Sequence, residues 1–164
     1  MSTRRFLPLL ISSAALIAAT APSFARSPFK SPAWLSIEAP VNPWDPSTRG
    51  QALLVHTQVV NGAAKLSELS GTAEGLLNGT RRSVSLRFDS LARPSTFGVR
   101  RQWPNEGTWL LRIVLRETTA LVNVDANGNP TTARVVTESS TGMPLPRAVA
   151  DREIDSALTQ ASKR

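Results

Sequence analysis

The sequence predicts an all-β fold, an antiparallel β-sandwich of about seven or eight short strands followed by a short C-terminal α-helix. Short segments recur in which apolar and polar residues alternate, as strands covered on one face require. Turn-forming pairs such as Asn78-Gly79 and Asn127-Gly128 separate these segments. A helical spacing of apolar residues occurs only near the end of the chain, so the pattern is not the strand–helix alternation of a parallel sheet.

The chain begins with the pattern of a cleaved export signal. Arg4 and Arg5 precede an apolar run over residues 6–21, and Ser23-Phe24-Ala25 supplies small residues at the positions that a signal peptidase prefers. We therefore predict a signal peptide over residues 1–25 and a mature chain that begins at Arg26. This pattern places the mature protein in the periplasm or outside the cell.

A retained membrane anchor is the alternative for the same segment. Pro8 and Ser12-Ser13 interrupt the apolar run, which is shorter than the ~20 residues that a membrane-spanning helix needs. Cleavage is therefore favoured, and no later segment is apolar enough to span a bilayer.

Composition excludes several classes of protein. The 164-residue chain has no cysteine, so neither disulfides nor thiol chemistry is available. Its formal net charge is +7, which favours anionic surfaces such as lipid headgroups or acidic glycans. Nucleic acid is a poor expectation for an exported protein, and none is predicted as a partner.

The mature chain divides into a sandwich region, residues 26–140, and a linker with a helix, residues 141–164. The sandwich region begins with a proline-rich lead-in that contains one short strand, 33–38. Glycines within the predicted strand 69–77 indicate a bulge or a close approach of backbone. Besides the stretch 96–115, further strands are expected at residues 51–60, 69–77, 81–88, 119–124 and 131–138.

The stretch 96–115 is expected to form the central hairpin of the sandwich. Phe97 and Val99 alternate on one face of its first strand. The second strand carries an apolar stripe headed by Trp109, and residues 104–107 between the strands have turn chemistry. The stripe consists of Trp109, Leu111, Ile113 and Leu115.

Residues 151–162 are predicted to form the C-terminal helix. Ile154, Ala157, Leu158 and Ala161 follow the i, i+3, i+4, i+7 spacing of one helix face, and Asp151 is a candidate N-cap. A helix of this length is marginal alone, so it must pack against another surface.

The stretch 96–115 resembles part of the immunoglobulin-like domains of exported bacterial proteins, namely the YtkA-like and FixH-like groups and, more loosely, the CopC-like copper proteins. The residues that carry the resemblance are Phe97-Gly98-Val99, Pro104, Gly107, Trp109, Leu111 and Ile113. It implies an immunoglobulin-like antiparallel β-sandwich. It does not extend to copper binding, because no His and Met ligands surround His56 or Met143.

The residue inventory disfavours catalysis and metal binding. His56 is the only histidine and lies in the middle of an apolar strand, where a half-buried position on a sheet face is expected. A nucleophilic triad would need this base beside a nucleophile, and a metal site would need several converging ligands. Residues 125–129 lack the spacing of a calcium loop and are expected to form a turn. We therefore predict no enzyme activity, no metal and no cofactor.

Arginine residues and loop tryptophans are the candidate binding residues. If the strands that carry the arginines are neighbours, the guanidinium groups would form one basic face; otherwise that face is solvated and neutralised by glutamates. A loop tryptophan such as Trp44 often covers the open end of a core, but Trp44 and Trp103 are also contact candidates. The arginines of the predicted face are Arg87, Arg100, Arg112 and Arg116, and Arg101 lies beside Trp103.

These observations predict a non-catalytic binding module of the bacterial cell envelope. Its expected partner is an envelope protein or an anionic envelope component. The alternative is a carrier of a small ligand or a metal, with His56 as the ligand-binding residue. The sequence leaves the oligomeric state open.

Overall fold

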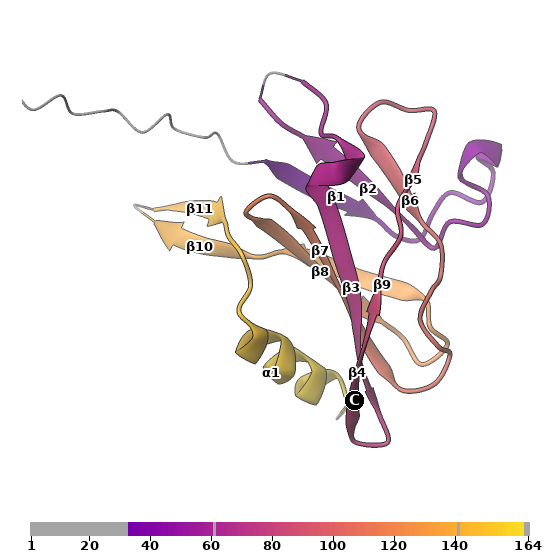
Figure 1. The fold of residues 1–164 in the computed structure, drawn as a ribbon, viewed down its shortest axis with the longest axis vertical. Helices are drawn as coiled ribbons and strands as arrows, with labels where there is room; N and C mark the ends of the chain where they lie inside the picture. The colour runs from indigo at the N-terminus through magenta and orange to yellow at the C-terminus, as the bar shows by residue number, and fades with distance from the viewer. Residues whose placement is uncertain (1–32, 61, 141, 163–164) are drawn as a thin grey trace, which may run out of the picture.

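The computed structural model describes residues 33–60, 62–140 and 142–162 as two antiparallel sheets packed face to face, with a small hairpin and one C-terminal helix (Figure 1). The predicted all-β sandwich with a terminal helix is thus confirmed. The predicted signal peptide lies outside the described residues. The four-stranded sheet has the order β1 (Trp34–Glu38), β2 (Leu53–Gln58), β6 (Thr96–Val99), β5 (Asp89–Ser90). The five-stranded sheet has the order β4 (Thr80–Ser85), β3 (Leu69–Leu77), β7 (Thr108–Leu115), β8 (Thr118–Val124), β9 (Pro130–Val135).

The main core lies between the two sheets and consists of the alternating residues that the sequence indicates. β2 contributes Leu53 and Val55, and β6 contributes Phe97 and Val99. The apolar stripe headed by Trp109 on β7 faces them, as predicted. Each of these strands directs every second side chain into this core because successive side chains point to opposite faces of a sheet.

The predicted central hairpin is wrong, because its two strands belong to different sheets. β6 pairs with β2 and β5, whereas β7 pairs with β3 and β8. Residues 100–107 therefore cross from one sheet to the other. Gly107, at φ 86°, supplies the positive φ expected of the turn. The same turn chemistry serves a hairpin and a crossover, so the local pattern did not distinguish them.

Two glycine positions explain features of β3. Asn78 and Gly79 have φ values of 48° and 76°, as the predicted tight turn between β3 and β4 requires. Gly75 lies under the ring of Trp109, where a Cβ would come within 2.5 Å of the ring carbons. The approach at Gly75 is thus made by a side chain, whereas the expected backbone approach occurs at Gly71, where a Cβ would lie 2.9 Å from the Arg112 carbonyl oxygen.

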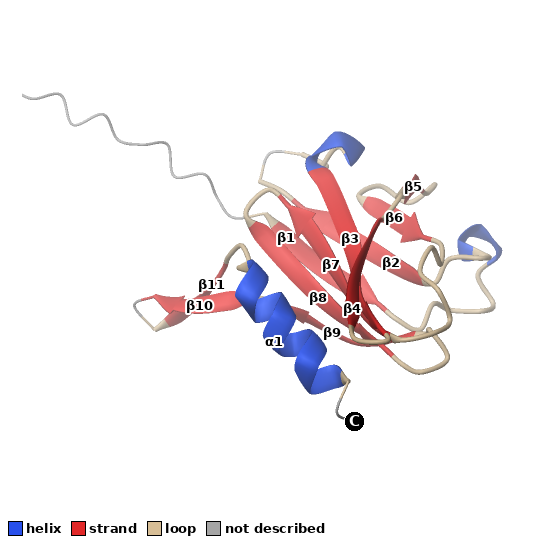
Figure 2. Ribbon diagram, turned by 60° about the horizontal axis from the view of Figure 1, so that its bottom comes forward, coloured by secondary structure: helices blue, strands red, loops and turns tan. Residues whose placement is uncertain are grey.

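Helix α1 (Asp151–Ala161) covers part of the outer face of the five-stranded sheet (Figure 2). Ile154 and Leu158 pack on Leu110 of β7 and Leu121 of β8, forming a second apolar cluster. The predicted apolar face of the helix is therefore buried against its own sandwich. Asp151 is the first helical residue rather than the predicted cap, since Ala150 takes the N-cap position.

Charged residues also connect the helix to the sheet through ion pairs and a hydrogen bond. Glu74 on β3 is buried and accepts a hydrogen bond of 2.9 Å from the hydroxyl of Ser83. Arg81 on β4 lies 3.4 Å from the Glu74 carboxylate and also pairs with Asp155 of α1. This chain of contacts joins the sheet edge to the middle of the helix.

A small hairpin, β10 (Thr137–Ser140) and β11 (Met143–Pro146), extends beside the sandwich (Figure 1). The sequence indicated a single strand over 131–138 followed by a linker, so this hairpin was missed. It spans the predicted boundary at residue 140. Within the described part of the chain, no helix is long and apolar enough to cross a membrane.

Candidate functional site

Trp44 is an exposed tryptophan on a loop that hydrogen bonds hold in place. Its side chain is 90% exposed, so it does not cover the core as loop tryptophans often do. The Trp44 amide donates to Asn42 Oδ1 at 3.0 Å, and the amide and hydroxyl of Ser47 donate to Asp45 Oδ1 at 2.9 and 2.6 Å. Arg93 pairs with the second oxygen of Asp45. The loop, which we call the Trp44 loop (residues 42–48), therefore presents the indole on an ordered support.

The Asp45 carboxylate gives the Trp44 loop a pH limit. Its pKa is held below the usual 3.8, first by the side-chain hydrogen bond from Ser47 and then by the Ser47 amide and Arg93. Because the folded-state pKa is lowered, the ionised Asp45 carboxylate stabilises the loop at pH values above its usual pKa of 3.8. This stabilisation is lost as the pH falls through the lowered pKa. We expect the Ser47 amide resonance to titrate with a midpoint below 3.8 and Asp45→Asn to abolish that titration. A midpoint at or above 3.8 would contradict the capping role of Asp45.

Three of the predicted arginines lie around one groove of about 500 Å³, lined by Arg87, Arg100 and Arg101. Arg100 Nε donates to Asp89 Oδ2 at 2.9 Å, so a carboxylate already neutralises part of the groove. The pKa of Asp89 is lowered by hydrogen bonds from Gln51 and from Arg100. The groove is thus basic but partly neutralised.

Trp103 is a core residue, so its prediction as a contact residue is wrong. It is 3% exposed, and its indole Nε1 donates to the Gly128 carbonyl at 3.0 Å. Arg101 lies beside the same loop and donates to the Asn127 carbonyl at 2.9 Å. The loop itself is a turn closed by Asp125, whose carboxylate accepts from the amides of Asn127 and Asn129. Trp103 is buried because residues 100–107 cross between the sheets and bring it over the end of the core.

The predicted single basic face does not form. Arg112 lies on β7 in the five-stranded sheet, whereas Arg100 follows β6 in the four-stranded sheet, so they face opposite sides of the sandwich. Arg116 lies in the turn after β7 with φ 54° and donates to Glu68 Oε1 at 3.0 and 2.7 Å. The arginines therefore occupy three separate surfaces.

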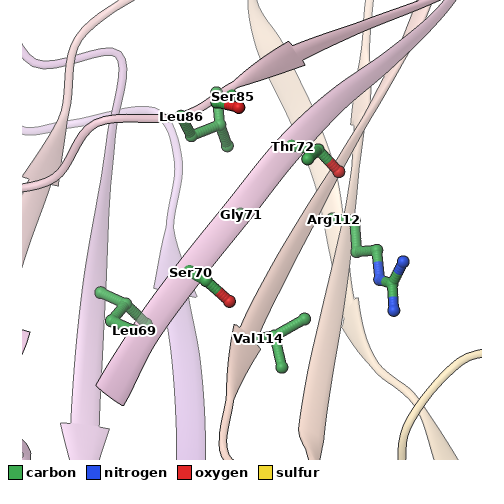
Figure 3. Close-up of a pocket in the computed structure, with 8 residues that line it drawn as sticks. All are labelled: Leu69, Ser70, Gly71, Thr72, Ser85, Leu86, Arg112 and Val114. Atoms are coloured by element: carbon green, nitrogen blue, oxygen red, sulfur yellow. The ribbon is translucent and has the colours of Figure 1, made fainter. Parts of the chain in front are cut away.

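Arg112 lines a pocket of about 530 Å³ on the outer face of the five-stranded sheet (Figure 3). The hydroxyl oxygens of Ser70 and Thr72 on β3 point toward the neighbouring strand, which carries Arg112 and Val114. Sequence reasoning found the arginine but missed these hydroxyl groups. The alternation of Ser70 and Thr72 along β3 was the available signal. The other lining residues are Leu69, Gly71, Ser85 and Leu86.

His56 lies half exposed on the outer face of the four-stranded sheet, as predicted. Its Nε2 is 3.0 Å from Glu38 Oε2, and its Nδ1 is 3.3 Å from the Thr96 hydroxyl. Thr96 is 5% exposed and also lies 3.3 Å from the Pro94 carbonyl, so its oxygen is not presented to a substrate. His56 and Trp34 line a pocket of about 320 Å³.

The described residues contain no group of three or more His, Cys, Asp or Glu side chains placed to hold a metal ion. His56 and Glu38 alone form a two-residue pair, which is short of the ligand number that stable metal sites use.

No family model, curated protein or solved structure matches the chain. Among the large apolar side chains of the described residues, that of Trp44 is the most exposed.

Proposed function

We propose that this protein is an exported, non-catalytic binding module of the bacterial cell envelope that contacts an envelope component through the Trp44 loop. Export is supported by the basic and apolar pattern of residues 1–25. The immunoglobulin-like character of the sandwich rests on the sequence resemblance at residues 97–113.

The observation that carries the proposal is the exposure of Trp44 on an ordered support. Trp103 and Trp109 are only 3% and 2% exposed, whereas Trp44 is 90% exposed. Leaving so large an apolar side chain in water is unfavourable, and tryptophans of this kind are frequent energetic centres of interfaces. The hydrogen bonds of Asp45 and Asn42 also reduce the entropy lost when the loop binds.

Binding should therefore depend on the indole ring. The immobilised mature chain, residues 26–164, is incubated with envelope extract, and the recovered partner is then titrated against the wild type and two variants. Trp44→Ala is expected to weaken binding at least about tenfold, as loss of a hot-spot tryptophan does. Trp34→Ala, at a half-exposed tryptophan on β1, is the matched control and should leave binding unchanged.

Salt separates an apolar contact from an ionic one. Contact through Trp44 should survive high salt, because salt screens exposed charges and not apolar burial. Equal binding by Trp44→Ala and the wild type, with release by salt, would instead assign the contact to the groove of Arg87, Arg100 and Arg101.

A small-ligand carrier is the second candidate function, and the pocket beside His56 favours it. The half-exposed Trp34 offers a ring on which an aromatic or aliphatic ligand would pack, and His56 offers a polar group. In that case Trp34→Ala, and not Trp44→Ala, would abolish binding.

A further inference from the structure

The outer face of the five-stranded sheet is only partly covered. Helix α1 packs over Leu110 and Leu121 and begins at Asp151, beside Arg112. Strand β4 is shorter than β3, and its pairing with β3 starts at Thr72 and Ser85. The section of β3 before Thr72 therefore lacks a neighbouring strand on this side, apart from the Leu86 amide, which donates to the Gly71 carbonyl at 2.9 Å. The pocket of Figure 3 occupies this notch.

Three buried polar atoms on this face have no hydrogen-bond partner among the described residues: Thr72 Oγ1, Arg112 Nε and Thr119 Oγ1. Thr72 is the direct cross-strand partner of Arg112, and Thr119 is the partner of Val114, two residues further along β7. The three residues are therefore neighbours on adjacent strands. A buried polar atom without a partner is unfavourable, so this side of Arg112 has hydrogen-bonding capacity that the described residues do not meet.

Arg112 retains most of its hydrogen-bonding capacity. The nearest carboxylate oxygen, Asp151 Oδ1, lies 3.6 Å from Arg112 Nη1, which is an ion-pair distance but too long for a hydrogen bond. The Asp151 side chain is 80% exposed, so water competes for it. The guanidinium side chain is 30% exposed and reachable from the pocket. Asp151 thus neutralises Arg112 only in part.

We propose that this pocket binds the oxyanion group, carboxylate or phosphate, of a small organic molecule. Arg112 supplies the charge and a planar fork of donors that matches two oxygens of such a group. Ser70 supplies an exposed hydroxyl donor, and its cross-strand partner Val114 offers an apolar contact for the aliphatic part of the ligand. This site is on the opposite sheet from the Trp44 loop and does not depend on the function proposed above.

Anion binding is tested on the whole mature chain by NMR, with inorganic phosphate, acetate and butanoate as probes. The amides of Thr72 and Thr119 and the Arg112 Nε–H are expected to shift and saturate. A several-fold preference for butanoate over acetate would indicate a carboxylate ligand with an aliphatic chain, because each buried CH₂ contributes about 0.8 kcal/mol. Tighter binding of phosphate than of either carboxylate would indicate a ligand that carries a phosphate group.

Two variants give opposite expectations. Arg112→Gln should weaken binding of the best probe at least about tenfold, because the charge and the fork are lost. Asp151→Asn should strengthen it several-fold, because it removes the carboxylate that competes for the guanidinium. Arg116→Gln, in the turn after β7, and Asp155→Asn, on the same helix as Asp151, are the matched controls and should leave binding unchanged.

Because Asp151 is exposed at the first position of α1, its variant tests the site even if Arg112→Gln fails to fold. Shifts that do not saturate, or equal affinities in the wild type and Asp151→Asn, would overturn the proposal and leave only water in the pocket.

Discussion

Replacing Trp109 by alanine is expected to lower the free energy of unfolding by about 3–5 kcal/mol, as truncation of a buried aromatic side chain does. Trp109 is 2% exposed and stands at the end of the apolar stripe of β7. Its indole Nε1 donates to the Glu106 carbonyl at 2.7 Å, so the substitution also leaves this turn carbonyl without its donor. The residue directly beside Trp109 on the neighbouring strand β3 is Gly75, which has no side chain to fill the space left by the ring.

The matched control for this prediction is Trp44→Ala. The same atoms are removed at a side chain that is 90% exposed, so stability should change by no more than about 0.5 kcal/mol. Both variants are compared by urea unfolding, which also reports through its slope whether the native state remains compact. Equal losses at the two positions would show that Trp44 packs against the protein in solution.

The sequence predicted the faces of the strands well, because alternation is a local property. A strand with an apolar residue at every second position buries that face whichever strand lies beside it, as Leu53 and Val55 show. The turn at Asn78-Gly79 was equally predictable, because its positive φ at both central residues is a local requirement that Asn and Gly meet.

Sheet membership was not predictable, because it depends on partners distant in the sequence. Val99 and Thr108 are only a few residues apart, yet β6 pairs with β2 and β7 pairs with β3. This error also affected the candidate site, because Trp103 was expected on a hairpin but lies in the core. Trp44 has no such constraint, and nothing in its local sequence distinguished a buried ring from an exposed one.

The pocket at Arg112 illustrates the same division. Alternation along β7 correctly predicted that Arg112 points away from the core between the sheets. Its neighbours Thr72 and Thr119 come from strands on either side, and only the pairing of β3, β7 and β8 brings them together. The alternation within one strand carries no information on that pairing, so the hydroxyl groups around the guanidinium were missed.

Replacing Ile154 by alanine is expected to release helix α1 from the sheet, at a cost of about 2–5 kcal/mol. Ile154 is fully buried in the cluster that joins the helix to Leu110 and Leu121. An 11-residue helix is marginal without packing, so the helix unfolds when the contact is weakened. The ion pair of Arg81 with Asp155 is exposed and cannot replace this contact, because exposed pairs contribute at most about 1 kcal/mol.

Native-state hydrogen exchange distinguishes local release from global unfolding. In Ile154→Ala, amides of α1 should lose protection more than amides of β7, because the core between the sheets keeps all its residues. Gln160→Ala, at an exposed helix position, should leave both sets of amides unchanged. An equal loss of protection in α1 and β7 would mean that the helix and the sandwich unfold together. The second apolar cluster would then be as necessary to the fold as the core between the sheets.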